Sequence, residues 1–408
     1  MNWWVGCYWH EPDAPRDPVG LVRIWALADA LAAVGEQVTV FAPRYRSALM
    51  RRRASVIPIP MLPWRGIRPI SYAIAAFLAG LLAGLRAKPA VVYYRWMESP
   101  HPIILAKLFG AACICEVNGE PVPPWQASGW KSGLTHALAG WALRRCDRVV
   151  TLTDGLAQLV TTRYGVNPDR LSVLPSGSDL TLFRPLDKAR CRRETELDPA
   201  GEYIGFVGTF YRYQGLDLLL QAFVRVRVIC PAARLVLVGD GEEAAALRDE
   251  ADRLGLAPFI TWTGRVPYAR VPVLLGAMDV CVAPFRGGRG ETSPVKLFDY
   301  LACGKPVVAS AIPSVTDLFS PTNGVVFVEP DRVDALAEGI VAVLTDPERG
   351  LRLGEVGRAA VEHRFGWESI AAQLRGIVAN ITGIDRTTTH PRTQPPPTVA
   401  ANNAGGRP

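Results

Sequence analysis

The stretch that decides the fold runs from Glu291 to Ser310 and reads ETSPVKLFDYLACGKPVVAS. Pro294 suits the first turn of a helix, where its missing N–H is not needed, and Gly304 suits the end of that helix. The apolar run that follows is typical of a buried parallel strand. The stretch therefore predicts a helix over 295–303 and then a strand, as in α/β proteins.

This helix brings two carboxylates and a lysine close to one helix N-terminus. Glu291 lies in the loop before the helix, Lys296 near its first turn and Asp299 one to two turns inside. Free backbone N–H groups at a helix N-terminus, with a lysine beside them, form a site for an anionic group such as phosphate. The pattern indicates a nucleotide-sugar site. An ordinary surface pair of carboxylates beside a helix is the alternative.

These residues resemble the signature of the family-4 retaining glycosyltransferases, which have the GT-B fold. Members show Glu, seven residues and Glu, followed by a strand similar to Gly-Lys-Pro-Val-Val, and here Asp299 stands in place of the second glutamate. The resemblance implies an α/β protein with two facing Rossmann-like domains, parallel sheets and an interdomain cleft. It also implies that Glu291 hydrogen-bonds sugar hydroxyls and that Asp299 binds the ribose of the donor.

Length and composition agree with two domains. The chain has 408 residues, 49% of them hydrophobic and 20% charged, which is long for one core and typical of a globular protein. Its eight cysteines are scattered, without a Cys-x-x-Cys pair, and indicate buried thiols in a reducing compartment. The sequence shows no His and Cys cluster and no Asp-x-Asp pair. We therefore expect a metal-independent reaction, with no cofactor besides the nucleotide-sugar co-substrate.

Strand-like and helix-like segments alternate along both halves of the chain. Predicted strands are 3–9, 37–41, 55–60, 90–95, 112–117, 148–151, 171–174, 203–207, 234–238, 259–263, 279–283, 306–310 and 325–328. Predicted helices are 20–34, 70–87, 99–109, 130–144, 154–164, 215–229, 242–255, 268–276, 295–303 and 332–345.

The pattern is interrupted where the two halves join, and the resemblance implies a role for each half. We expect an acceptor-side domain over 1–184, a linker over 185–200 and a nucleotide-sugar-binding domain over 201–364. A helix over 365–380 is expected to cross back onto the first domain. Residues 381–408 are rich in Pro, Thr and Gly and are predicted to be disordered, because they can bury little apolar surface.

A second segment, IGFVGTFYRYQGLDLLL over 204–220, resembles the family's loop that faces the donor diphosphate. A glycine such as Gly208 lets the backbone approach phosphate oxygens closely. Most relatives carry an arginine directly after this glycine and a lysine before the next, where this chain has Thr209 and Gln214. We expect Arg212 and Lys296 to replace those two cations. Arg212 as a solvated loop residue is the alternative.

Further positions match the family one at a time. The turn at Gly239 is not the Gly-x-Gly-x-x-Gly dinucleotide fingerprint, and it fits the family's turn near the nucleotide. Arg265 and Val266 match the turn where relatives hold the base, largely through main-chain groups. Gly20 matches one of two glycines that relatives place against the donor phosphates and the acceptor, while Val19 replaces the other. Gly20 as an ordinary loop residue is an equal alternative.

Asn118 stands where many relatives have a histidine near the transferred sugar. An amide donates and accepts hydrogen bonds but does not act as a base at neutral pH. This departure argues against an inverting mechanism with a general base at this position. The resemblance implies a retaining front-face reaction, in which the leaving phosphate accepts the proton of the acceptor. Glu291 and Asn118 are the residues that we expect nearest to the reacting atoms.

The excess of basic residues indicates an anionic binding partner. The net charge is +7, and Arg44, Arg46 and Arg51–Arg53 lie just upstream of the apolar segment 70–85. Anionic lipid headgroups attract such a cluster by about 1 kcal/mol per residue, although a solvated loop is the alternative. The apolar segment is slightly short for a bilayer span, and its sequence leaves core packing and membrane contact equally open. No nucleic-acid-binding motif accompanies the charge, so we do not expect nucleic acid as a partner.

Together, the matching segments cover nearly all of residues 1–380. We expect a retaining hexosyltransferase that moves a sugar from a nucleotide diphosphate to a glycan or lipid-linked acceptor, in polysaccharide or glycoconjugate biosynthesis. Thr292 and Ser293 are expected to help stabilise the departing diphosphate. No secretory signal is visible, so we expect a cytoplasmic protein, peripheral on the cytoplasmic face of the membrane. Two alternatives stay open: a non-catalytic family member that acts as an assembly partner, and a GT-B nucleotide-sugar epimerase or hydrolase.

Overall fold

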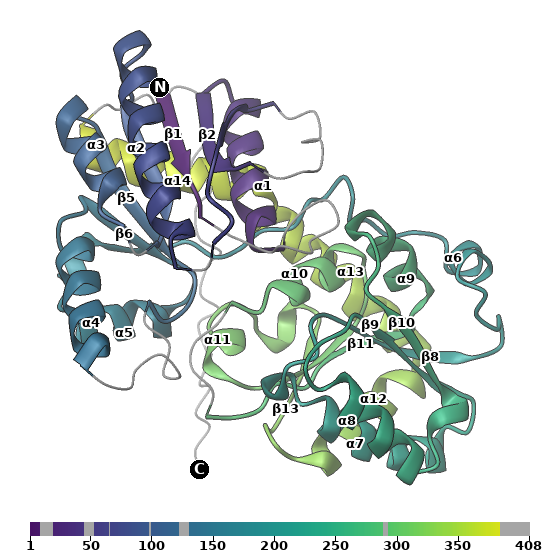
Figure 1. The fold of residues 1–408 in the computed structure, drawn as a ribbon. Helices are drawn as coiled ribbons and strands as arrows, with labels where there is room; N and C mark the ends of the chain where they lie inside the picture. Colours follow the sequence, from purple (N-terminus) through teal and green to yellow (C-terminus); the bar gives the residue numbers. More distant parts are fainter. Residues whose placement is uncertain are drawn as a thin grey trace, which may run out of the picture.

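Two α/β domains stand side by side in the structure, each built on one parallel sheet with helices on both faces (Figure 1). This computed structural model describes residues 1–8, 19–44, 53–64, 66–97, 99–121, 130–288 and 293–383. The predicted GT-B architecture of two Rossmann-like domains is confirmed.

The elements of the first sheet and its helices come from the N-terminal half. The strands are β1 (Asn2–Gly6), β2 (Gln37–Pro43), β3 (Ser55–Ile59), β4 (Val91–Arg95), β5 (Ala112–Val117), β6 (Arg148–Thr151) and β7 (Leu171–Val173). The helices are α1 (Val19–Ala33), α2 (Arg68–Arg86), α3 (His101–Phe109), α4 (Trp130–Leu143) and α5 (Asp154–Tyr164).

The C-terminal half supplies the second sheet. Its strands are β8 (Glu202–Val207), β9 (Ala233–Val238), β10 (Ile260–Gly264), β11 (Val280–Ala283), β12 (Val307–Ser310) and β13 (Val325–Val328). The helices are α6 (Lys188–Glu194), α7 (Leu216–Ile229), α8 (Ala244–Arg253), α9 (Val271–Ala277), α10 (Val295–Ala302), α11 (Pro313–Thr316), α12 (Val333–Leu344), α13 (Pro347–Arg364) and α14 (Trp367–Thr382).

Both sheets are doubly wound. The strand order is β3-β2-β1-β4-β5-β6-β7 in the first and β10-β9-β8-β11-β12-β13 in the second, with all pairs parallel. Such strands are buried on both faces, which explains runs such as LVLV in β9. The strand order reverses between β1 and β4, and between β8 and β11. Ligands of open α/β sheets bind at the carboxyl ends of the strands near such reversals.

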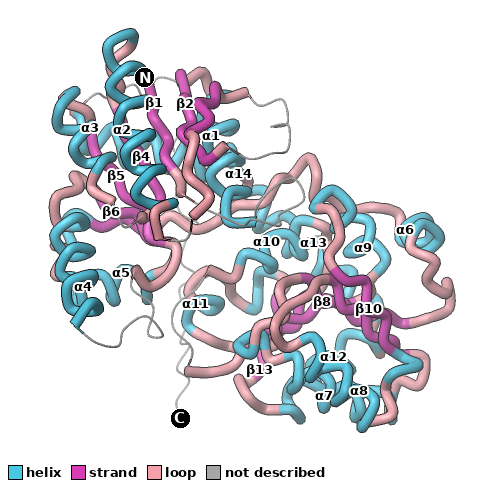
Figure 2. The backbone as a smooth tube through the Cα atoms, in the orientation of Figure 1, coloured by secondary structure: helices cyan, strands magenta, loops and turns pink. Residues whose placement is uncertain are grey.

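The helices divide between the faces of each sheet. In the first domain, α1 packs on one face, and α2, α3, α4 and α5 cover the other. In the second, α7, α8 and α12 pack on one face, and α9, α10 and α13 on the other. The chain crosses between the domains after β7 and again after α13. The last helix, α14, lies against α1 in the first domain, whereas α13 belongs to the second (Figure 2).

The structure contains each of the thirteen predicted strands, but the helix prediction was incomplete. Two of the missed helices are α6, in the segment read as a linker, and α13. Glycine lowers helix propensity, and α13 contains Gly350, Gly354 and Gly357. These glycines allow close packing: a Cβ on Gly354 would lie 2.0 Å from the carbonyl oxygen of Gly304. The tail predicted to be disordered lies outside the described residues from residue 384 on.

Candidate active site

Two glycine turns meet at the carboxyl ends of β8, β9 and β10. The Gly208 N–H donates to the Val238 carbonyl oxygen at 3.0 Å, and the Gly239 N–H donates to that of Gly264 at 2.9 Å. Gly239 has φ of 133°, and a Cβ there would lie 2.0 Å from the Gly208 carbonyl oxygen. Only glycine fits such a close approach of two backbones. The turns therefore present main-chain groups, without side chains, at the edge where ligands bind.

Lys296 places its ammonium group against the first of these turns. Its Nζ lies 3.8 Å from the centroid of the Phe206 ring and donates a hydrogen bond to the Gln214 side chain. A Cβ on Gly208 would lie only 3.1 Å from this Nζ. The aromatic face stabilises the cation. These contacts put one positive charge at the edge of the sheet, on a residue that we predicted to bind the donor phosphates.

Gln214 explains how the chain accommodates Lys296. It lies in a short 3-10 helix, Arg212–Gln214, and only 6% of it is exposed. Its amide oxygen accepts the hydrogen bond from Lys296. A lysine at 214, as in most relatives, would bring a second ammonium next to the first, and like charges disfavour each other. The nearest described ammonium to position 214 comes from Lys296 on α10, where the sequence led us to expect a replacement cation.

Arg212 is exposed beside these turns. Its guanidinium makes no hydrogen bond or ion pair with any residue that the structure describes. The rings of Tyr211 and Tyr213, on either side of it in sequence, stack with their centroids 5.6 Å apart. Arg265 is also exposed and follows β10, next to the half-buried Val266. Gly20 lies in the first turn of α1.

The N-terminus of α10 begins at Val295. The prediction of Pro294 in the first turn is wrong by one residue, because its ψ of 56° is not helical and it precedes the helix. The Ser293 hydroxyl, just before Pro294, is buried and has no hydrogen-bond partner among the described residues. Buried polar atoms are nearly always paired, so this hydroxyl at a helix N-terminus is available as a hydrogen-bonding group. Glu291 and Thr292 lie outside the described residues.

Asp299 contacts the segment that joins the domains. The Ser178 hydroxyl donates to its Oδ1 at 2.6 Å, across 121 positions of sequence. Burial raises the pKa of Asp299 to about 7, the hydrogen bond from Ser178 lowers it, and the charge of Asp179 adds a smaller increase. The carboxyl therefore changes its charge near neutral pH, at the junction between the two domains.

The pKa of Asp299 predicts how stability depends on pH. Because the folded pKa is about 7, above the ordinary 3.8, the folded protein holds a proton that the unfolded chain has lost between these values. The free energy of unfolding should therefore fall as pH rises from 4 to 7, by at most about 1.4 kcal/mol per pH unit from this group. Asp299→Asn should remove this contribution and be more stable than wild type above pH 7.

Urea unfolding at several pH values measures this effect. Asp252→Asn, which changes an exposed carboxyl on α8, is the matched control and should keep the slope of the wild type. Identical pH slopes for wild type and Asp299→Asn would show that the carboxyl does not titrate in this range.

A buried ion pair ties α1 and β5 to the same junction. Arg23 Nε donates to Glu116 Oε2 at 2.9 Å, and the Tyr93 hydroxyl donates to the same oxygen. Arg23 also donates to the carbonyl oxygens of Pro175 at 3.0 Å and Leu174 at 3.3 Å. These two carbonyls lie just past β7, where the chain leaves the first domain. The pair therefore holds the start of the connection in place.

Asn118 follows the same strand. Within the part of the chain that the structure describes, its Oδ1 is buried without a hydrogen-bond partner, and so is Oε1 of Glu116. Two unpaired acceptors at the carboxyl end of β5 suit a donor such as a hydroxyl of a ligand or an ordered water. Sequence reasoning missed Glu116, although a carboxylate in the apolar strand ACICEV is an unusual feature that could have revealed it. Nothing in the pattern of α1 distinguishes Arg23.

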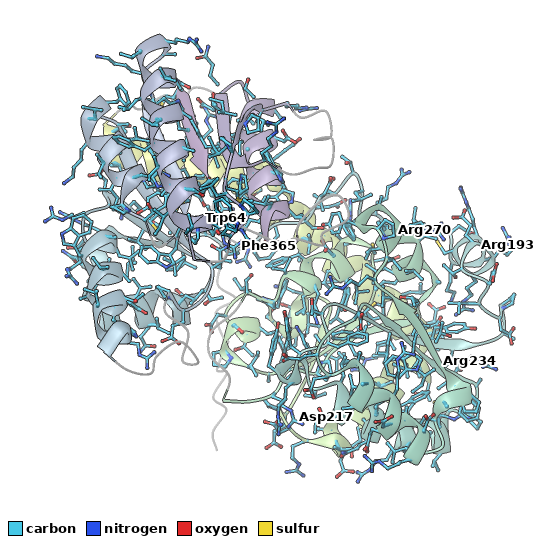
Figure 3. The ribbon with its side chains drawn as sticks, viewed as in Figure 1. Trp64, Arg193, Asp217, Arg234, Arg270 and Phe365 are labelled. Carbon is cyan, nitrogen blue, oxygen red and sulfur yellow. The ribbon has the colours of Figure 1, made fainter. Side chains whose placement is uncertain are left out.

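A cavity of about 410 Å³ also lies between the two domains. Its walls include Asp154 and Val173 from the first domain, and Asp317 and Phe365 from the second. Figure 3 shows Phe365 at this junction. Gly208, Gly239 and Lys296 are not among its described lining residues. The candidate site at the glycine turns is therefore distinct from this cavity.

Comparison with known proteins identifies the family. A model described as "Glycosyl transferase 4-like domain" matches residues 21–177, and one described as "Glycosyl transferases group 1" matches residues 201–346. The GDP-mannose-dependent monoacylated alpha-(1-6)-phosphatidylinositol monomannoside mannosyltransferase of Corynebacterium glutamicum is 30% identical over 301 residues, which covers 69% of this chain and 75% of that protein. The chain belongs to the family-4 GT-B glycosyltransferases.

Other relatives agree with this assignment. A D-inositol 3-phosphate glycosyltransferase of Segniliparus rotundus is 32% identical to this chain over 241 residues. The match covers 58% of this chain and 52% of the relative. The chain spans about half the length of this and similar curated relatives. Sucrose-phosphate synthase from Thermosynechococcus elongatus has the same fold, with a TM-score of 0.74 at 20% identity over 93% of this chain and 99% of that chain.

Proposed function

We propose that this protein is a retaining hexosyltransferase that moves a sugar from a nucleotide diphosphate sugar to a glycan or lipid-linked acceptor. The observation that carries the proposal is the position of Lys296, whose ammonium lies against the Gly208 turn and beside the N-terminus of α10. This combination of a cation, an open backbone turn and a helix N-terminus suits a diphosphate. The relative from C. glutamicum is described as GDP-mannose-dependent, which supports a donor of this class.

The donor would lie across the carboxyl edge of the second sheet. Lys296, Arg212 and the Ser293 hydroxyl stabilise the charge that develops on the departing diphosphate, and we assign Thr292 to the same role from the sequence. Groups preorganised for such charge are worth several kcal/mol, typically about 3–4 kcal/mol for one donor. Asp299 hydrogen-bonds the ribose, and the turn at Arg265 holds the base. Two cations at the diphosphate take the part that a metal ion plays in other transferases, so we propose a reaction without one.

The transfer step needs no general base from the protein. The acceptor hydroxyl oxygen forms a bond to the anomeric carbon on the face from which the diphosphate leaves. The bond between that carbon and the phosphate oxygen breaks, and the hydroxyl proton passes to this phosphate oxygen. Asn118 orients the reacting groups by hydrogen bonds, and Glu291 steadies the positive charge that develops on the sugar. Closure of the domains excludes water, which would otherwise hydrolyse the donor.

The names of the relatives support a class of acceptor, and the cysteines support a cellular location. The relatives are named for D-inositol 3-phosphate and for a phosphatidylinositol mannoside, so a polyol phosphate or glycolipid acceptor is favoured. The described cysteines are all buried free thiols, which suit a reducing compartment. We therefore propose a cytoplasmic protein that acts in glycan or glycolipid synthesis at the inner face of the membrane, with no cofactor besides the donor.

A thermal-shift screen against UDP, GDP, ADP and their sugars tests the proposal. A ligand at about 100 times its Kd should add about 2.7 kcal/mol of stability, and Glu291→Ala should weaken the response to the sugar form. A folded protein that responds to none of them would contradict the proposal and favour a non-catalytic assembly partner. Consumption of the donor without any acceptor would instead indicate an epimerase or a hydrolase.

Arg212→Ala should weaken the binding of the nucleotide sugar about 10- to 100-fold, because an arginine contributes about 1.5–3 kcal/mol through hydrogen bonds to a charged group. Isothermal titration calorimetry measures the change. Arg253→Ala, on the surface of α8 and paired with Glu250, is the matched control and should bind like wild type. Unchanged affinity in Arg212→Ala would mean that Arg212 is only a solvated loop residue.

A further inference from the structure

The helix α2 packs against its domain with its small residues. Its buried residues are Tyr72, Ala76, Gly80 and Gly84. The glycines allow α3 to come close, because a Cβ on Gly80 would lie 2.5 Å from Leu105 Cδ1 and one on Gly84 would lie 2.1 Å from Phe109 Cζ. The Tyr72 hydroxyl donates to the carbonyl oxygens of Cys7 and Phe41 and so fixes the helix to the sheet.

The large apolar residues of α2 lie on the opposite side. Ile70, Ile74, Leu78, Leu82 and Leu85 are between 54% and 81% exposed. The first four are spaced by four residues and therefore form one stripe along the helix. A surface helix of a globular domain normally turns its large apolar residues toward the core. Folding of the domain does not account for this reversed arrangement, so the stripe needs another partner.

The stripe continues over neighbouring segments on the same side of the first sheet. Exposed apolar side chains include Leu62, Trp64 and Ile67 before α2, Ile104 and Leu108 on α3, and Leu134, Leu138 and Trp141 on α4. We call these residues and the stripe of α2 the apolar face. The helices α2 and α3 lie next to each other in Figure 1, and Trp64 lies on the side of its domain that faces the second domain in Figure 3. A set of this size marks an interaction surface.

The charge around the apolar face has one sign. Between Arg44 and Phe109 the sequence contains eleven basic residues and one acidic residue, Glu98. Of the basic residues, Arg86, Lys88 and Lys107 are exposed at the ends of α2 and α3. A second copy of the chain would meet this face with the same face in a two-fold dimer and would bring like charges together. An anionic lipid surface complements both the charge and the apolar side chains.

We infer that the apolar face docks onto an anionic lipid bilayer, with α2 lying in the interface along the membrane. Within the described residues, α2 is the one helix long and apolar enough to cross a membrane. Its inner side is fixed to the sheet by Tyr72, so it lies on the bilayer instead of spanning it. The inference does not depend on the proposed transfer reaction, although a lipid-linked acceptor would be within reach of a protein held in this way.

Flotation of the full chain with phosphatidylcholine vesicles that contain phosphatidylglycerol tests the inference. The wild type should float with them, and the variant Leu78→Glu/Leu82→Glu should bind at least about tenfold more weakly, because two carboxylates replace the centre of the apolar stripe. The matched control is Val228→Glu/Ile229→Glu, which changes two exposed apolar residues at the end of α7 in the second domain. This control should float like wild type. Circular dichroism verifies that both variants are folded.

Any of four results would overturn the inference. The wild type fails to float, the Leu78→Glu/Leu82→Glu variant floats as well as the control, or the wild type is a dimer that this variant dissociates. Binding that is equally strong to vesicles of phosphatidylcholine alone would refute the role of anionic lipid. Binding of the nucleotide sugar, measured on the same samples, separates the two proposals. A protein that floats but binds no donor would support the membrane-docking inference and contradict the proposed transferase function.

Discussion

Lys296→Ala is expected to lower kcat/KM with the nucleotide sugar donor by about 100- to 1000-fold, the loss typical of removing one preorganised charge-stabilising group. The ammonium of Lys296 lies against the Gly208 turn, where no side chain separates it from a bound diphosphate. Phe206 and Gln214 hold it there in advance. Most of the loss should appear in kcat, because the charge on the leaving group grows in the transition state. Steady-state kinetics with saturating acceptor measures it.

Two variants show whether the charge or the packing of Lys296 matters. Gln214→Lys added to Lys296→Ala returns an ammonium from the neighbouring position that relatives use, and it should recover at least about tenfold of the lost activity. Lys188→Ala, in an exposed ion pair with Asp279, is the matched control and should keep wild-type activity. Full activity in Lys296→Ala would remove Lys296 from the candidate site.

Glu116→Ala is expected to lower the free energy of unfolding by about 3–5 kcal/mol, because it leaves a buried arginine without its counter-charge. Arg23 is only 8% exposed, and Glu116 is fully buried. Their separation across the sequence is 93 positions, so the pair holds together distant parts of the first domain. Chemical denaturation, followed by circular dichroism, measures the change.

A double-mutant cycle separates the pair from its surroundings. Arg23→Met combined with Glu116→Ala removes both charges and should be less destabilising than the sum of the single changes. Glu194→Ala breaks an exposed pair with Arg190 and should change stability by less than about 1 kcal/mol. If Glu116→Ala is no more harmful than Glu194→Ala, the ion pair does not hold the domain together.

Much of the fold can be predicted because parallel strands are buried on both faces. Such strands stand out as short apolar runs between helical segments, and this pattern located all thirteen strands. Helix prediction failed where a residue is required for close packing and not for helix formation. The glycines of α13 discourage a helix locally, yet Gly354 allows this helix to touch the Gly304 turn. A single sequence does not contain that contact.

The candidate site was only partly visible in the sequence. Motif spacing pointed to Gly208, Lys296 and Asp299, because the family pattern is local. The partners of these residues come from far away in the chain: Gln214 lies 82 positions from Lys296, and Ser178 lies 121 positions from Asp299. Spacing describes neighbours within one element and contains no information about which elements meet. The fold was needed to reveal that Gln214 is the acceptor for Lys296.

The sequence by itself determined two doubly wound domains, a family-4 signature and an apolar segment after a basic cluster. Only the tertiary structure decided which side of that segment faces outward. A helix that is apolar all round has no preferred side until something packs against it, and here α3 packs against Gly80 and Gly84. Close packing selects the small residues for the inside, and Leu78 and Leu82 are left on the surface. The sequence specifies the apolar residues, and the packing of α2 against α3 determines which of them are exposed on the surface.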